Sequence, residues 1–141
     1  MNYSRMALAA LAAWIVYFVV GGLVSGMLIA DYYRPYPAVY RSRDTVMGLF
    51  PIGIAGMLIA MLALSLMYAK GYEGGSGWME GLRFGLLVGI FVAGAVVGDE
   101  YVTLNIGGKL ALVMAAGRLF GWMVVGVTIG LVYKPGTARP G

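Results

Sequence analysis

The sequence predicts an all-α integral membrane protein with four transmembrane helices in a compact, glycine-packed bundle with short loops. Hydrophobic residues make up 61% of the 141 positions and charged residues only 11%. Four apolar runs are each long enough to cross a bilayer core, which takes about 20 residues. The chain also has 23 glycines, a residue type that lets membrane helices approach closely. We expect one transmembrane domain over residues 1–141, with no separate soluble catalytic unit.

The first two predicted helices cover residues 6–30 and 46–69. The first follows Arg5 and is longer than the 7 to 15 apolar residues of a signal-peptide core, so we expect it to be retained. The second contains Pro51 near its expected start, where the missing N–H of proline costs least. It ends at the glycine-rich stretch KGYEGGSG, a composition that terminates helices.

The third predicted helix covers residues 78–104 and the fourth 110–133. Lys134 and Pro135 end the fourth helix, and residues 134–141 form a polar tail. Four helices place both termini on one side of the membrane.

Positive charges are almost evenly divided between the two sides of the predicted membrane domain. The side of the termini carries Arg5, Lys70, Arg83, Lys134 and Arg139, and the other side carries Arg34, Arg41, Arg43 and Lys109. Five against four predicts cytoplasmic termini by a small margin. The near balance is also compatible with insertion in both orientations and with antiparallel dimers. The expected location is the cytoplasmic membrane of a prokaryote.

Glycines four residues apart predict the faces on which the helices meet. In lipid, helices associate through close backbone approach at small residues. At about 100° per residue, each glycine pair keeps to one face of its helix. The predicted packing positions are Gly22, Gly26, Gly81, Gly85, Gly89, Gly94, Gly98, Gly117, Gly121, Gly126 and Gly130. The simpler alternative is the general abundance of glycine in membrane helices.

Arg118 is the only charged residue between Leu110 and Tyr133. It lies about 12 Å from Leu110 along the helix, and its side chain leans back toward the preceding loop. Asp99 and Glu100 are expected near that same interface. We predict that Arg118 pairs with Asp99 or Glu100, because an unpaired charge at that depth is costly. The alternative is that Arg118 extends to the interface without a partner.

A second pair of opposite charges, Glu80 and Arg83, stands three residues apart in the third predicted helix. This spacing predicts an interfacial salt bridge of structural importance only.

The first loop, DYYRPYPAVYRSRD, combines tyrosines with arginines. Tyrosine is typical of the headgroup level, and arginine suits phosphate. The loop therefore predicts either an ordinary aromatic belt or a site for anionic lipid headgroups or an acidic partner. The residues of this site would be Tyr32, Tyr33, Arg34, Tyr36, Tyr40, Arg41 and Arg43.

Three families of small membrane proteins share some features with the chain. Met57 and Met61 resemble the methionine pair of the Ctr-type copper transporters, which have three spans and methionine-rich segments outside the membrane. The small multidrug transporters are similar in size but need a glutamate in the first helix, which residues 6–30 lack. The fluoride channels carry a TFST-like filter that is also missing. We therefore assign the chain to no family.

The absence of cysteine and histidine excludes disulfides, thiol nucleophiles, common zinc sites and histidine-ligated haem. We expect no enzyme, no cofactor, no metal and no nucleic-acid partner. The favoured function is an accessory or assembly subunit, or a lipid-binding scaffold, in a homo-oligomer or a larger membrane complex. The alternative is a small dimeric transporter or channel for an anion or proton that uses Arg118 with Asp99 or Glu100.

Overall fold

The computed structural model describes residues 1–133, which form helices and connecting segments without strands. Four helical spans are long and apolar enough to cross a membrane: Tyr3–Leu28, Arg43–Lys70, Gly77–Thr103 and Gly108–Val132. The prediction of four apolar helices is therefore confirmed, and the bounds lie close to the expected ones. The predicted polar tail, residues 134–141, lies outside the described residues.

The first and third spans are not single α-helices. The first consists of α1 (Tyr3–Leu23) and the π-helix η1 (Val24–Leu28), and the short α2 (Ala30–Tyr33) follows. The third consists of α4 (Gly77–Phe91), the π-helix η2 (Val92–Val97) and α5 (Gly98–Thr103). A π-helix bonds i to i+5, so it rotates the residues that follow it relative to an α-helical count.

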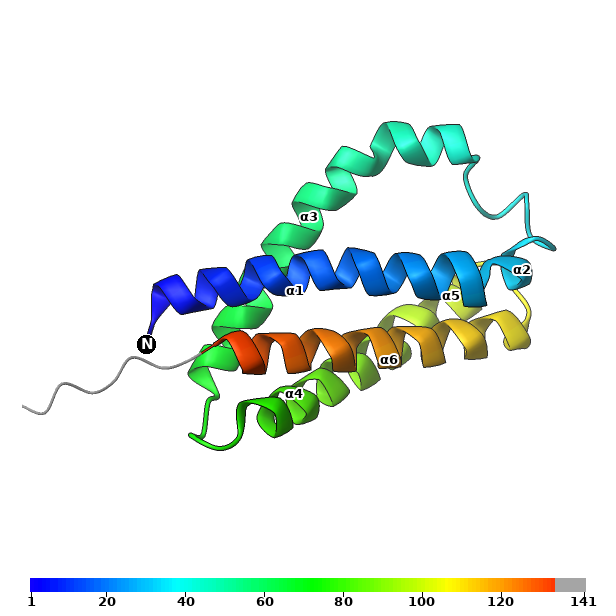
Figure 1. The fold of residues 1–141 in the computed structure, drawn as a ribbon. Helices are drawn as coiled ribbons and strands as arrows, with labels where there is room; N and C mark the ends of the chain where they lie inside the picture. The colour runs from blue at the N-terminus through cyan, green and yellow to red at the C-terminus, as the bar shows by residue number, and fades with distance from the viewer. Residues whose placement is uncertain (134–141) are drawn as a thin grey trace, which may run out of the picture.

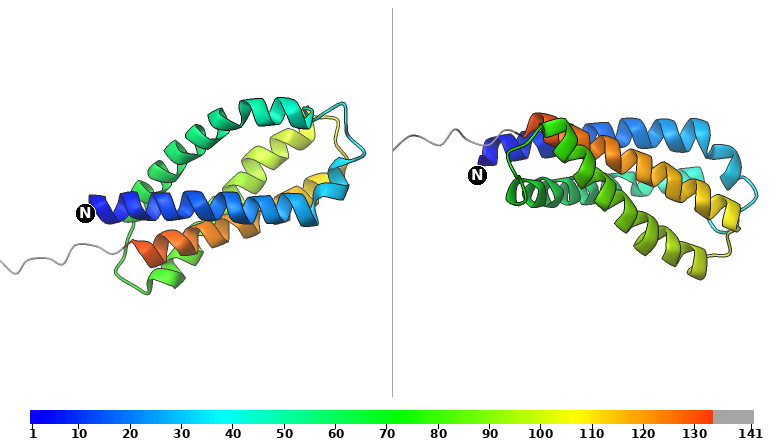
Figure 2. Two further views of the ribbon diagram at one scale, coloured as in Figure 1. Left: turned by 45° about the horizontal axis from the view of Figure 1, so that its top comes forward. Right: turned by 90° about the horizontal axis from the view of Figure 1, so that it is seen from below.

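Helix α6 (Gly108–Val132) lies between α1 and α4, and α1 also packs against α3 (Arg43–Lys70) (Figures 1 and 2). The N-terminus and the end of α6 lie at the same end of the molecule (Figure 1). The loop before α3 and the turn between α5 and α6 lie at the opposite end (Figure 1).

Helix α3 is bent, and its N-terminal part stands away from the other helices (Figure 1). The helix begins at Arg43, with Ser42 as its N-cap, earlier than the sequence predicts. Pro51 therefore lies inside the helix and not near its start, which corrects the expectation. An interior proline removes one backbone hydrogen bond and its ring clashes with the preceding turn, and both effects bend a helix.

Small residues on α1 form the centre of the contact between α1, α3 and α6. Ala9, Ala10 and Ala13 are completely buried and pack in one cluster with Met61 and Ile129. Alanine side chains are small and allow the helices to approach closely. On α1 these alanines therefore form the close contact that was expected at glycines. The indole N–H of Trp14 donates to the carbonyl oxygen of Ile54 at 3.1 Å, which joins α1 to α3.

The backbones of α4 and α6 meet at glycines. Gly81, Gly85 and Gly89 are buried in α4 and face α6. A Cβ built on Gly81 would overlap the carbonyl oxygen of Gly126, and one built on Gly130 would overlap the carbonyl oxygen of Gly77. Side chains larger than hydrogen would therefore push the two helices apart.

Gly117 also has close neighbours, since a Cβ there would lie 2.8 Å from Cδ1 of Ile29 and 3.1 Å from Cγ1 of Val24. Five other predicted packing glycines have no atom within 4 Å of such a Cβ: Gly22, Gly26, Gly94, Gly98 and Gly121. No close approach occurs at these five positions within the described chain, and a packing role for them stays a prediction. The N-terminal part of α3 stands away from α1 (Figure 1), and α6 closely approaches α4 at Gly81, Gly85 and Gly89.

Candidate functional site

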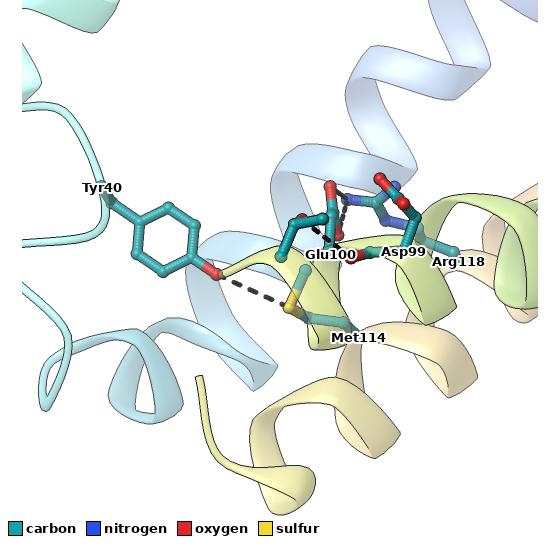
Figure 3. Close-up of polar contacts among 6 residues, drawn as sticks. Tyr40, Asp99, Glu100, Met114 and Arg118 are labelled. Carbon is teal, nitrogen blue, oxygen red and sulfur yellow. Dashed lines mark hydrogen bonds and ion pairs between the residues drawn. The ribbon is translucent and has the colours of Figure 1, made fainter. Parts of the chain in front are cut away.

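Arg118 and Glu100 form an ion pair between α6 and α5 (Figure 3). The Nη2 group of Arg118 donates to Oε1 of Glu100 at 3.0 Å and to Oε2 at 3.1 Å. The side chains are 34% and 26% exposed, so the pair is largely but not completely enclosed. Arg118 is the eleventh of 25 residues in α6, about 15 Å from the start of the helix. Arg118 is therefore near the middle of its apolar span, whereas Glu100 lies near the end of the third span.

Most hydrogen-bond donors of Arg118 remain free. A guanidinium has five N–H donors, of which two belong to Nη2, so Nη1 and Nε carry three. Within residues 1–133, these three donate to no protein acceptor. The Nη1 and Nε atoms of Arg118 are also not fully enclosed. In the described part of the chain, Ser65 Oγ is the only fully enclosed side-chain polar atom without a hydrogen-bond partner. A bound molecule could therefore accept these hydrogen bonds.

Asp99 was the other predicted partner of Arg118, and the structure does not pair the two. The Asp99 side chain is exposed, and its backbone carbonyl accepts a hydrogen bond from the Thr103 hydroxyl at 2.8 Å. The π-helix η2 precedes both acids and changes their rotational phase, so that Glu100 faces Arg118. A prediction that assumes a rotation of about 100° per residue throughout the helix cannot tell which of the two acids faces Arg118.

Arg118 lines a cavity of about 380 Å³ between α1, η1, η2 and α6, with Met57 of α3 at its border. This volume is in the range of small-molecule sites, about 300–1,000 Å³. Apolar and polar groups both line it, the latter including Ser25, Tyr33 and Arg118. The lining residues include Tyr17, Val20, Val24, Ser25, Tyr33, Val92, Val96, Gly121 and Trp122. The cavity thus combines apolar walls with a charged group that has donors to spare.

Both π-helices contribute to this cavity. Val24 and Ser25 belong to η1, and Val92 and Val96 belong to η2. A π-turn widens a helix locally, and such turns are frequent at functional sites. The sequence predicts Arg118 as a site residue, but the other lining residues could not be predicted because both spans were expected to be regular α-helices. The one available signal was Trp122, which stands one turn after Arg118 on the same side of α6.

Tyrosines of the first loop pack against the beginning of α6, and Tyr33 also lines the cavity. The rings of Tyr33 and Tyr40 meet edge to face at 5.0 Å, and the Tyr40 hydroxyl donates to Sδ of Met114 at 3.8 Å (Figure 3). The Tyr36 hydroxyl accepts a hydrogen bond from the backbone N–H of Gly107 at 2.9 Å. These contacts attach the loop to the beginning of α6.

Burial raises the pKa of the Tyr33 hydroxyl above its usual value of 10.0. The Arg118 guanidinium opposes this rise in pKa, and the Glu100 carboxylate adds to it. Tyr33 therefore stays protonated at neutral pH and can donate a hydrogen bond at the cavity.

The predicted headgroup loop divides into two groups of side chains. Its four tyrosines, Tyr32, Tyr33, Tyr36 and Tyr40, are partly buried, whereas Arg34, Arg41 and Arg43 are exposed. Arg34 forms an exposed ion pair with Asp31 at 3.2 Å, and the ammonium of Lys109 lies 5.5 Å from the ring centre of Tyr32. The loop thus presents cations outward, and binding of anionic headgroups there stays a prediction.

The predicted salt bridge between Glu80 and Arg83 is absent from the described residues, which corrects that expectation. Glu80 instead accepts hydrogen bonds from the backbone N–H of Gly75 and, at 3.5 Å, from the Tyr68 hydroxyl. Arg83 is exposed. The carboxylate turns back toward the start of α4, where unpaired N–H groups attract it.

Comparison with protein-family models, with curated proteins and with solved structures finds no match. Among residues 1–133, no three Asp, Glu, His or Cys side chains are grouped in a way that could hold a metal ion. The site must therefore be interpreted from its own geometry.

Proposed function

We propose that this protein is a lipid-binding membrane scaffold without catalytic machinery, and that the cavity beside Arg118 is its lipid site. The observation that carries the proposal is the cavity itself, with apolar walls from α1, η1, η2 and α6 and an arginine near mid-span. An amphipathic molecule needs this combination, because its chain requires apolar contact and its head requires hydrogen bonds.

The rest of the proposal concerns how the scaffold is assembled. The glycine contacts between α4 and α6 support a compact bundle held by close backbone approach. The exposed arginines of the first loop, Arg34, Arg41 and Arg43, suit the anionic headgroups of the bilayer. We propose that the protein acts as a homo-oligomer or as a subunit of a larger membrane complex in a prokaryotic cytoplasmic membrane.

Lipid retention tests the proposed site. A leucine at Gly121 would project into the cavity without a clash at its Cβ, because no atom lies within 4 Å of that position. Gly94→Leu is a matched control, since Gly94 has the same free space but does not line the cavity. Native mass spectrometry of protein extracted in mild detergent should show bound lipid on the wild type and on the control, and little on Gly121→Leu. Equal retention by all three proteins would reject the lipid site.

A transporter or channel for an anion or proton is the second candidate. The observation that favours it is the Arg118–Glu100 pair at the cavity wall, since intramembrane ionisable groups often mark a pathway. Purified protein in liposomes should show no selective ion flux if the scaffold proposal is right. A selective flux that the Arg118→Ala substitution abolishes would replace the scaffold with this second function.

A further inference from the structure

We propose that the cavity selects lipids with an uncharged, hydrogen-bond-accepting head, such as an ester or hydroxyl group, over lipids with an anionic head. This inference rests on the proposed lipid site and specifies its ligand class.

Arg118 and Tyr33 supply several hydrogen-bond donors to the cavity. Arg118 has three N–H groups without a protein acceptor in the described chain, and the hydroxyl of Tyr33 lies on the same cavity wall. A guanidinium has no acceptor, so a ligand that contacts it must offer oxygen or another acceptor. The lipid head is therefore expected to be an acceptor group placed between Arg118 and Tyr33.

The positive charge of Arg118 is balanced by a carboxylate of the same chain. Glu100 already holds the guanidinium of Arg118 at 3.0 Å, so the pair is neutral as a unit. An anionic head that reached the free side of Arg118 would be attracted by the guanidinium, and the Glu100 carboxylate behind it would offset part of that attraction. It would also lose its hydration in an apolar cavity. An uncharged acceptor forms weaker hydrogen bonds to the guanidinium, but it meets no repulsion from Glu100 and loses less hydration.

The rest of the cavity has room for a hydrocarbon chain. Besides Ser25, its lining includes four valine side chains, Val20, Val24, Val92 and Val96. They leave an apolar space for the hydrocarbon chain of the ligand. A single-chain lipid with a small head would place its polar end at Arg118 and its chain along these valines.

Two probes with the same hydrocarbon chain separate the head chemistries. Mono-oleoylglycerol carries an ester and hydroxyls, and oleate at pH 8 in aqueous solution carries a carboxylate. The full chain in mild detergent is incubated with equal amounts of both lipids, and the bound species are counted by native mass spectrometry. The wild type should retain the ester about tenfold over the carboxylate, the ratio that corresponds to about 1.4 kcal/mol.

Variants of the two acids test the reason for this preference. Glu100→Gln leaves Arg118 with an unbalanced positive charge, so the preference should reverse toward oleate. Asp99→Asn is the matched control, because Asp99 is not paired with Arg118, and it should keep the wild-type preference. Arg118→Gln should lower the retention of both probes.

The outcomes distinguish the inference from the proposed function. A wild type that prefers oleate, or a folded Glu100→Gln variant that keeps the wild-type preference, overturns the inference but leaves a lipid site in place. A wild type that binds neither probe and carries no lipid from the membrane rejects the proposed function, and the inference with it. If Glu100→Gln does not fold, the wild-type ratio of the two probes alone decides.

Discussion

At the scale of single residues, the Arg118–Glu100 pair should stabilise the folded chain. Removal of one partner leaves the other charge largely enclosed, which costs 3–5 kcal/mol in fully buried pairs and about 1–2 kcal/mol in one that is partly exposed. Arg118→Ala should therefore lower the thermal stability in detergent, and the double substitution Arg118→Ala with Glu100→Ala should recover part of the loss. Thermal unfolding of the four proteins of this cycle measures the coupling. If the effects of the two single substitutions on thermal stability are additive, the two side chains do not stabilise the protein as a pair.

Ser65 offers a second test at the residue scale. Its hydroxyl is completely buried in α3, and it is the one enclosed side-chain polar atom without a hydrogen-bond partner in residues 1–133. A buried hydroxyl without a partner costs about 1–3 kcal/mol of stability. Ser65→Ala should therefore raise the free energy of unfolding by about 1 kcal/mol.

The control for this test is Ser4→Ala, because Ser4 is exposed and its substitution should have no effect. Both variants are compared with the wild type by thermal unfolding in the same detergent. A clear loss of stability in Ser65→Ala would mean that the hydroxyl has a partner in solution.

The sequence could predict the ion pair only in part. The depth of Arg118 and its distance from the two acids were enough to predict a partner, since both follow from helix geometry. The choice between Asp99 and Glu100 depends on η2, and no residue pattern distinguishes a π-helix of valine, alanine and glycine from an α-helix. The lining residues of the cavity other than Arg118 were not predicted for the same reason.

At the scale of helices, the contact between α4 and α6 depends on the absence of a single carbon atom. A Cβ on Gly81 would overlap the backbone of Gly126, so Gly81→Ala must push the helices apart or strain them. We expect a loss of about 1–3 kcal/mol of stability, the usual cost of overpacking. Gly94→Ala, where no atom lies within 4 Å, should leave the stability unchanged or raise it, because alanine favours helix.

The same measurement, thermal unfolding in detergent, compares the two alanine variants. A similar loss of stability in both would show that Gly94 also has a packing role, in an oligomer that the single chain does not contain. No loss in either would mean that the close approach of α4 and α6 adds little to stability.

Helices were also the elements that the sequence predicted best. Their positions follow from the length of the apolar runs, which a bilayer imposes directly. Which glycines meet a neighbour was harder to predict, since it depends on how the four helices are arranged. Gly22 and Gly26 have the same spacing as Gly81 and Gly85, yet α3 turns away at the end of α1 where they lie. The bend at Pro51 is part of that arrangement and cannot be inferred from the hydropathy of α3.

At the scale of the whole molecule, the fold separates two ends of different character. One end carries the N-terminus, the end of α6 and the glycine-rich turn between α3 and α4 (Figure 1). The other carries the arginine-rich loop and lies closer to the cavity and its ion pair. The orientation of these two ends decides from which side of the membrane a headgroup reaches the loop. Because positive charges are nearly balanced between the two ends, the sequence determines the orientation in the membrane less well than any other property.

Cysteine labelling can measure the orientation, because the chain has no cysteine of its own. Single substitutions at exposed positions, Ser4→Cys and Glu73→Cys at one end and Ala38→Cys and Asn105→Cys at the other, give four probes. The small excess of positive charge at the termini predicts that this end is cytoplasmic. A membrane-impermeant maleimide added to intact cells should therefore label only the Ala38→Cys and Asn105→Cys proteins, and the other two should react only after the membrane is opened. Labelling of all four to about half in intact cells would instead demonstrate insertion in both orientations, and an antiparallel dimer would then place one cavity near each face of the bilayer.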